Sequence, residues 1–175
     1  MPRIRVHPEP MSNQHPELVR ELQLELQNNR EFGQPLILEE PFARSAELRI
    51  TVVWDKFDGI DDDERARIIL AAYQRSDAQP TRIAVALGLT FPEAADDGLL
   101  PYDVVPNWRA SDPVSLERCF GAMKQLGAST LRNPIEPELR CATAEHAGAC
   151  VSELVRLLPE SKGIWKIFGH MRATG

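Results

Sequence analysis

Hydrophobic and polar residues alternate in two segments of the chain, 48–54 and 83–89, and a helical pattern lies between them. In both segments, large apolar side chains recur at every second position, which is typical of half-buried strands. Asp58 and Gly59 form a turn pair after the first segment. Residues 62–76 then place apolar side chains on one side of a helix and charged ones on the other. The pattern predicts the order strand, turn, helix, strand.

The residues before this unit add a helix and a strand. A proline opens the apolar stripe of residues 16–29, at a position where its missing N–H costs nothing. Residues 35–39 are a short strand candidate, and Pro41 places that strand at a sheet edge. Segment 15–95 is therefore expected to form one domain.

The second half of the chain again mixes helices and strands. A helix is predicted from the cap at 111–113 to Gly127, and another begins after Thr143. Residues 139–142 are a short strand candidate, and 164–168 form either a strand or a short helix.

These elements predict an α+β (α/β) fold, with a small mixed sheet, helices packed on it, and a C-terminal extension of helices and strands. The expected organisation is a flexible tail (1–14), an αββαβ domain (15–95), a linker (96–110) and a C-terminal α/β subdomain (111–175).

Composition narrows the classes of function. The 175 residues are 43% hydrophobic and 26% charged, which is ordinary for a soluble globular protein. A net charge of −6 disfavours nucleic-acid binding, which needs a basic face. No apolar run is long enough to span a membrane, and residues 1–10 lack the apolar core of a secretory signal. Three cysteines without a dense framework indicate a reducing, cytoplasmic setting.

An acidic cluster follows the first alternating segment. Its members are Asp55, Asp58, Asp61, Asp62, Asp63 and Glu64. A calcium loop needs oxygen ligands at alternating positions with glycine at the sixth, and this register is missing. We therefore interpret the carboxylates as a turn and a helix start, where they cap free N–H groups and favour the helix dipole.

Cys141, His146 and Cys150 lie close together in the sequence. A helix starting at Thr143 would place His146 and Cys150, four residues apart, on one face. Cys141, just before that helix, is a candidate nucleophile with His146 as its base. The three residues are also candidate metal ligands, with Cys119 as a possible fourth. The simpler interpretation is that these cysteines pack as small hydrophobic residues.

The predicted order of elements resembles the αββαβ layout of BolA-like and type II KH-like domains. Phe57-Asp58-Gly59 is similar to the aromatic-x-Gly turn of BolA-like proteins, and Arg65 stands where that family carries arginine in its helix. The segment 90–93, Thr-Phe-Pro-Glu, is similar to the Thr-Pro-x-Glu that follows the family's last strand. BolA-like proteins carry a histidine in the helix and another at the last strand, but the corresponding segments here, 64–67 and 82–85, contain none. The resemblance therefore implies the fold without iron–sulfur cluster binding. The Gly-x-x-Gly loop of KH-like domains is absent as well.

The leading hypothesis is a non-enzymatic interaction module, an adaptor or accessory subunit that binds another protein and needs no cofactor. It rests on ordinary fold signals together with the absence of the common nucleotide, metalloprotease and hydrolase motifs. A homo-oligomer is possible. The alternatives are a cysteine-dependent enzyme using Cys141 and His146, or a KH-like nucleic-acid-binding protein. Candidate binding residues are Trp54, Phe57, Asp58, Arg65 and Trp108. The simplest role for the tryptophans, Trp165 included, is as core or interface anchors.

Overall fold

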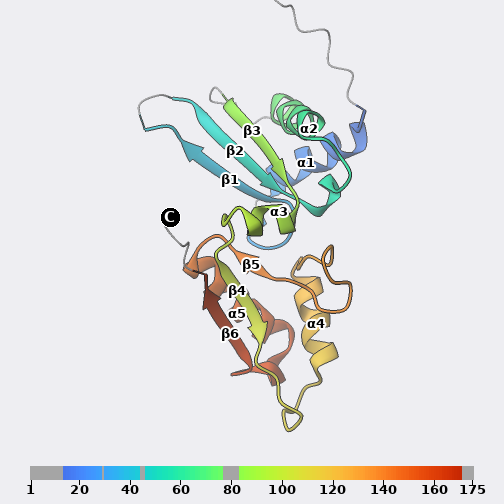
Figure 1. Ribbon diagram of the computed structural model, residues 1–175, viewed down its shortest axis with the longest axis vertical. Coiled ribbons are helices and arrows are strands. Elements are labelled where there is room, and N and C mark those ends of the chain that lie inside the picture. Colours follow the sequence, from blue (N-terminus) through green and yellow to red (C-terminus); the bar gives the residue numbers. More distant parts are fainter. Residues whose placement is uncertain (1–13, 29, 44–45, 77–82, 171–175) are drawn as a thin grey trace, which may run out of the picture.

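The computed structural model describes residues 14–28, 30–43, 46–76 and 83–170. The predicted tail therefore lies almost entirely outside the described residues. Within them, the chain forms two halves stacked along the long axis of the molecule, each with its own three-stranded sheet (Figure 1). The predicted mixed α+β fold is confirmed, with two small sheets in place of one.

The first half has the predicted order of elements. It consists of α1 (Pro16–Asn28), β1 (Leu36–Pro41), β2 (Leu48–Val53), a 3₁₀ turn (Asp55–Phe57), α2 (Asp62–Arg75) and β3 (Ile83–Leu89). β2 is the central strand, antiparallel to β1 and parallel to β3. β1 is therefore an edge strand, as Pro41 predicted. The helix α2 connects the two parallel strands in the manner of a crossover.

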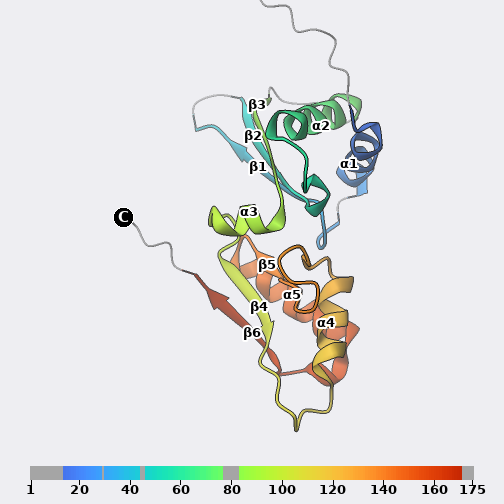
Figure 2. The same ribbon diagram turned by 45° about the vertical axis from the view of Figure 1, so that its right-hand side comes forward.

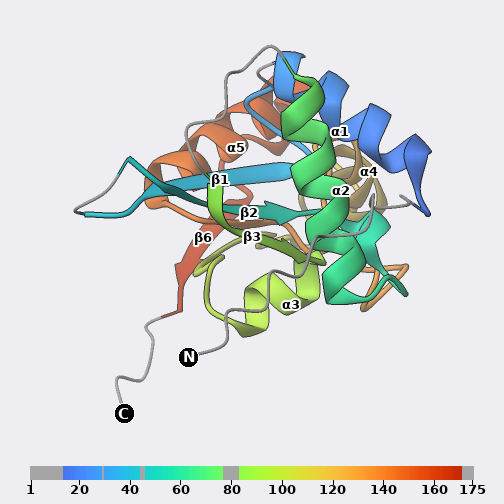
Figure 3. The ribbon, with the colours of Figure 1, turned by 90° about the horizontal axis from the view of Figure 1, so that it is seen from above.

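Both helices of this half lie on one side of the sheet (Figures 1 and 3). The core between helices and sheet is built from apolar side chains that recur at helical spacing in α1 and α2 and at every second position in β2. Its buried members include Val19, Leu22, Ile50, Val52, Trp54, Phe57, Ile68, Ile69 and Ala72. The alternation predicted for 48–54 is confirmed by this arrangement.

The start of α2 explains most of the acidic cluster. Asp61 is the N-cap, and its side chain accepts a hydrogen bond of 2.9 Å from the backbone N–H of Glu64. Gly59 adopts a φ of 74°, which a glycine tolerates without steric cost. Asp55 has another role, since its carboxylate accepts hydrogen bonds from the Gln34 side chain and from the backbone N–H of Phe91.

The larger side chains of β3 mostly face away from the helices. Ala86 and Gly88 pair with Ile50 and Val52 of β2 and face the helices, whereas Val85 and Leu87 lie on the opposite face. Gly88 is required there, because a Cβ at this position would lie 2.7 Å from the Cβ of Arg65 on α2. The close approach of α2 thus leaves the larger β3 side chains on the uncovered side of the sheet.

The short helix α3 (Phe91–Asp96) follows β3 and joins the two halves. Thr90 caps it with a full capping box that includes Glu93. Phe91 and Ala94 pack with Val53, Leu89 and Leu100 in a small third core at the lower end of the first sheet.

The second half contains β4 (Tyr102–Pro106), α4 (Leu116–Gln125), β5 (Arg140–Cys141), α5 (Ala144–Leu157), a 3₁₀ turn (Pro159–Ser161) and β6 (Trp165–Gly169). Its sheet is antiparallel in the order β5-β4-β6, and α5 packs against it (Figure 2). The core includes Val104, Cys119, Met123, Cys141, Ala147, Cys150, Leu154 and Trp165.

Two predictions for this half are wrong. The expected linker 96–110 contains β4, the central strand of the second sheet, which pairs with strands that lie far along the chain. The helix α4 begins after the N-cap Ser115 and not at 111–113, since the Ser115 side chain accepts from the N–H of Arg118. The segment 164–168 is resolved as a strand, β6.

The halves meet at a tight backbone contact. Gly33, in the loop after α1, and Gly127, after α4, both have positive φ, and a Cβ on Gly127 would lie 2.5 Å from the Cα of Gly33. The Gln34 side chain donates to the carbonyl oxygen of Gly127 and accepts from the N–H of Asp55 at 2.7 Å. The loop after α1 therefore anchors the first half on the second.

Candidate functional site

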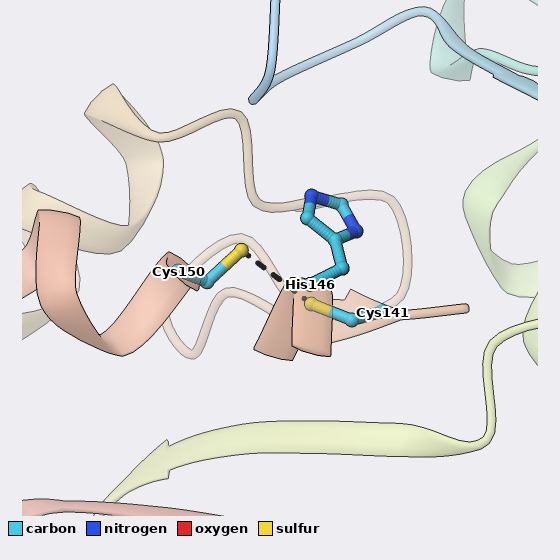
Figure 4. A group of neighbouring side chains, drawn as sticks. All are labelled: Cys141, His146 and Cys150. Carbon is cyan, nitrogen blue, oxygen red and sulfur yellow. Dashed lines mark hydrogen bonds between the residues drawn. The ribbon is translucent and has the colours of Figure 1, made fainter. Parts of the chain in front are cut away.

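The second half brings Cys141, His146 and Cys150 together (Figure 4). Cys141 ends β5, and Thr143 then caps α5 by accepting from the N–H of His146. One turn later, Cys150 points from α5 back toward β5. The helix start predicted at Thr143 is confirmed, and so is the prediction that His146 and Cys150 lie on one face of that helix.

The functional atoms of the three side chains form a compact group. The sulfur atoms of Cys141 and Cys150 are 3.5 Å apart, and a ring nitrogen of His146 lies within 4.8 Å of both. Both cysteines are free thiols and are buried, whereas His146 is half-buried. Figure 4 shows the sulfur atoms pointing toward each other, with the imidazole beside them.

His146 is held in place by the first half of the chain. Its ring stacks on Phe32, with the centroids 5.9 Å apart and the planes 16° from parallel. Its Nε2 lies 3.2 Å from the carbonyl oxygen of Glu31. Both residues belong to the loop after α1, so this group of side chains lies where the two halves meet.

The pKa values of the two thiols are shifted in opposite directions. The thiol of Cys141 donates to the sulfur of Cys150, and this hydrogen bond, with help from His146, lowers the pKa of Cys150 to about 6. The same hydrogen bond, together with burial, raises the pKa of Cys141. The pKa of His146 is raised because the imidazolium is stabilised by a hydrogen bond to the sulfur of Cys150. Cys150 is therefore the thiolate of the pair.

This environment bears on the hypothesis of a cysteine nucleophile. Cys141 is fully buried and holds its proton, which disfavours the predicted pairing of Cys141 with His146 as its base. Cys150 has the acidity of a nucleophile but is itself buried. The cavity beside it and His146 has a volume of about 20 Å³, room for about one water molecule. The site can hold a water or an ion, and a substrate would need the two halves to move.

Cys119 is not part of the site. Among the described residues, the group of close ligand atoms contains Cys141, His146 and Cys150 alone. Cys119 is buried on α4, and burial raises the pKa of its thiol. The expectation that Cys119 could serve as the fourth ligand is therefore wrong.

Most of the predicted binding residues are buried. Trp54 and Phe57 lie in the core of the first half, and their rings contact each other edge to face. Arg65 is also buried and is fully engaged by the carbonyl oxygens of Ile60 and Gly88 and by Glu93. These three residues stabilise the fold and offer no surface to a partner.

The other two binding candidates stay predictions. Asp58 is exposed, at the turn before α2. Trp108 is half-buried against the second core, and its indole N–H donates to the carbonyl oxygen of Val114.

The structure reveals a surface that the sequence pattern did not assign, which we call the open face. It is the side of the first sheet that faces away from α1 and α2, and among the described residues only its lower end is covered, by α3. Its members beyond that end are Leu38, Glu40, Arg49, Thr51, Val85 and Leu87, of which Thr51, at the centre, is buried. The signal for it was the alternation at 83–89, which fixes one apolar face but does not say which face the helices cover.

None of the helices in the described ranges has both the length and the apolar character needed to cross a bilayer. Comparison with protein-family models, with curated proteins and with solved structures finds no match for this chain. The likeness to BolA-like and KH-like domains therefore rests on the order of elements and on the short motifs in the first half.

Proposed function

We propose that this chain is a non-enzymatic interaction module, an adaptor or accessory subunit of the cytoplasm, and that it binds a protein partner through the open face. The main support for this proposal is the exposure of two apolar side chains, Val85 (39%) and Leu87 (36%). Both lie on a sheet face that, among the described helices, only α3 covers, and only at its lower end. A sheet with one apolar face in water is stabilised when a further layer covers it.

The expected occupant is an amphipathic helix of the partner with basic residues beside its apolar stripe. Helices are the usual covering layer of such a sheet, as α1 and α2 show on the other face. The basic flank follows from the net charge of −6 alone, because Glu40 on the open face is paired with the exposed Arg49 of the neighbouring strand. The free, buried thiols are consistent with a reducing compartment.

Selection from a displayed peptide library tests this proposal with the full-length chain as bait. We expect enrichment of peptides that can form amphipathic helices with lysine or arginine beside the apolar stripe. Leu87→Lys should weaken binding of the enriched peptides by ~10-fold or more, because a charge would be buried at the centre of the contact.

Ile135→Lys is the matched control, because Ile135 is 76% exposed and lies outside the open face, in the loop before β5. This variant should bind as the parent chain does. Equal loss in both variants, or enrichment of peptides with no helical period, would contradict the proposal. So would a dimer in sedimentation analysis that Leu87→Lys converts to monomer, since the open face would then be covered by a second copy of the chain.

A further inference from the structure

The Cys141–His146–Cys150 group has the composition and spacing of a site for a thiophilic metal ion. We propose that it binds one Zn²⁺ ion, with the two sulfur atoms and one imidazole nitrogen as protein ligands. The proposal is independent of the open face, which lies on the other half of the molecule.

The sulfur atoms are already close to the separation that zinc requires. Two thiolates bound tetrahedrally at ~2.3 Å from zinc are about 3.8 Å apart. In this structure the distance between them is 3.5 Å, so binding needs a shift of a few tenths of an ångström. One imidazole nitrogen lies within 4.8 Å of both and has to move closer to them to complete three corners of the tetrahedron.

The type of ligand selects the class of metal. Magnesium and calcium bind oxygen ligands, and a pair of thiols with an imidazole offers none. Sulfur and nitrogen ligands suit zinc, which takes combinations of cysteine and histidine in four-coordinate sites. The carbonyl oxygen of Glu31 supplies a further feature of such sites, because histidines that bind metals usually donate their other N–H to an oxygen.

His146 is thus oriented from outside the group. Glu31 accepts the hydrogen of Nε2, which leaves a lone pair on Nδ1 of the neutral ring, and Phe32 stacks on that ring. Neither contact is needed if the cysteines serve only as core packing.

The fourth position belongs to a water molecule. The cavity of about 20 Å³ beside His146 and Cys150 has room for about one water, and its lining includes Gly33, Gly127 and Arg140, whose charge is paired with Asp103. Zinc at this position would connect β5 to α5 directly and would reach the loop after α1 through His146. Three protein ligands and a water form an open zinc site and not a closed structural one, so we assign the ion no role beyond joining β5, α5 and the loop after α1.

The test uses the full chain, purified reduced, stripped of metal and titrated with Zn²⁺ against a chromophoric chelator. One equivalent should bind, and Co²⁺ should give the charge-transfer absorbance of two thiolates. Cys141→Ser and Cys150→Ser should lose more than the ~10–100-fold in affinity that follows loss of an outer contact alone. The control is Cys119→Ser, which removes a buried cysteine outside the group and should bind zinc as the parent does.

Alkylation of the parent chain in partly denaturing urea, mapped by mass spectrometry, covers the case in which a serine variant fails to fold. Zinc should protect Cys141 and Cys150 against alkylation more than Cys119. Equal protection of all three, equal loss of affinity in Cys119→Ser, or binding of Cu⁺ but not Zn²⁺ would overturn the assignment. A reduced parent chain that takes up no zinc at micromolar free concentration would overturn it as well.

Discussion

At the site between the two halves, Cys141 and Cys150 share one hydrogen bond and so acquire different chemistry. A thiolate is stabilised when a neighbouring group donates to it, and a thiol is stabilised when its proton is accepted. Cys141 donates, so its pKa rises, while Cys150 accepts and has a pKa of about 6. His146 adds to the second effect, and the raised pKa of His146 is the counterpart. The pair therefore carries one thiolate at neutral pH in the metal-free chain.

Ultraviolet absorbance of the thiolate checks this assignment in the reduced, metal-free chain. One thiolate should appear as the pH rises through about 6, since Cys150 is a neutral thiol below its pKa and ionised above it. Cys150→Ser should abolish this step, and His146→Gln should move the midpoint to higher pH. Cys119→Ser should leave it unchanged, because burial raises the pKa of Cys119. A first thiolate that appears only near the ordinary value of ~8.5 would contradict the prediction.

At the scale of elements, the packing of α2 on the first sheet depends on a strand with small side chains. Gly88 of β3 lies under Arg65, whose guanidinium donates to the carbonyl oxygen of Gly88 and to both carboxylate oxygens of Glu93. A buried arginine is tolerated because its donors are satisfied in this way. Arg65 and Glu93 therefore hold α2 on β3 and α3.

Gly88→Ala should lower the free energy of unfolding by ~1–3 kcal/mol, the usual cost of overpacking. The added Cβ would lie 2.7 Å from the Cβ of Arg65 and 3.0 Å from Cε2 of Phe57, so α2 would have to move. Gly121→Ala is the control, because Gly121 lies inside α4 with nothing within 4 Å of the added Cβ. It should raise stability by ~0.5–1 kcal/mol through helix propensity. Urea unfolding measures both, and equal effects would rule out the close approach.

Local patterns were sufficient for the elements of the first half and for part of the site. The period of residues 48–54 and the cap at Thr143 depend on neighbours in sequence, so both could be predicted. β4 was missed because Pro101 precedes it, Pro106 ends it, and its partners β5 and β6 lie more than thirty residues away. Which face of β3 the helices cover, and the contact of Glu31 with His146 across 115 positions, are set by tertiary packing alone.

At the scale of the whole molecule, the two halves have separate cores and separate sheets, so their coupling depends on a few contacts at the junction. The backbone contact of Gly33 with Gly127 is one, and the hydrogen bonds of Gln34 to Asp55 and Gly127 are another. A third is the contact of the loop after α1 with His146, and a fourth is the hydrogen bond from Arg132 to the carbonyl oxygen of Pro92 on α3. Disturbing the junction should therefore separate the unfolding of the two halves.

Gly127→Ala tests this coupling, with Gly163→Ala as its control. Both glycines have a φ near 90°, so each substitution carries the ~1–2 kcal/mol cost of a side chain in the left-handed region. Only at Gly127 would the new Cβ also meet the other half, 2.5 Å from the Cα of Gly33, whereas at Gly163 nothing lies within 4 Å. Gly127→Ala should therefore cost more stability, and hydrogen exchange should show β2 and α5 losing protection at different urea concentrations. If both variants lose stability equally and each still unfolds in one step, the halves are coupled by contacts other than this backbone approach.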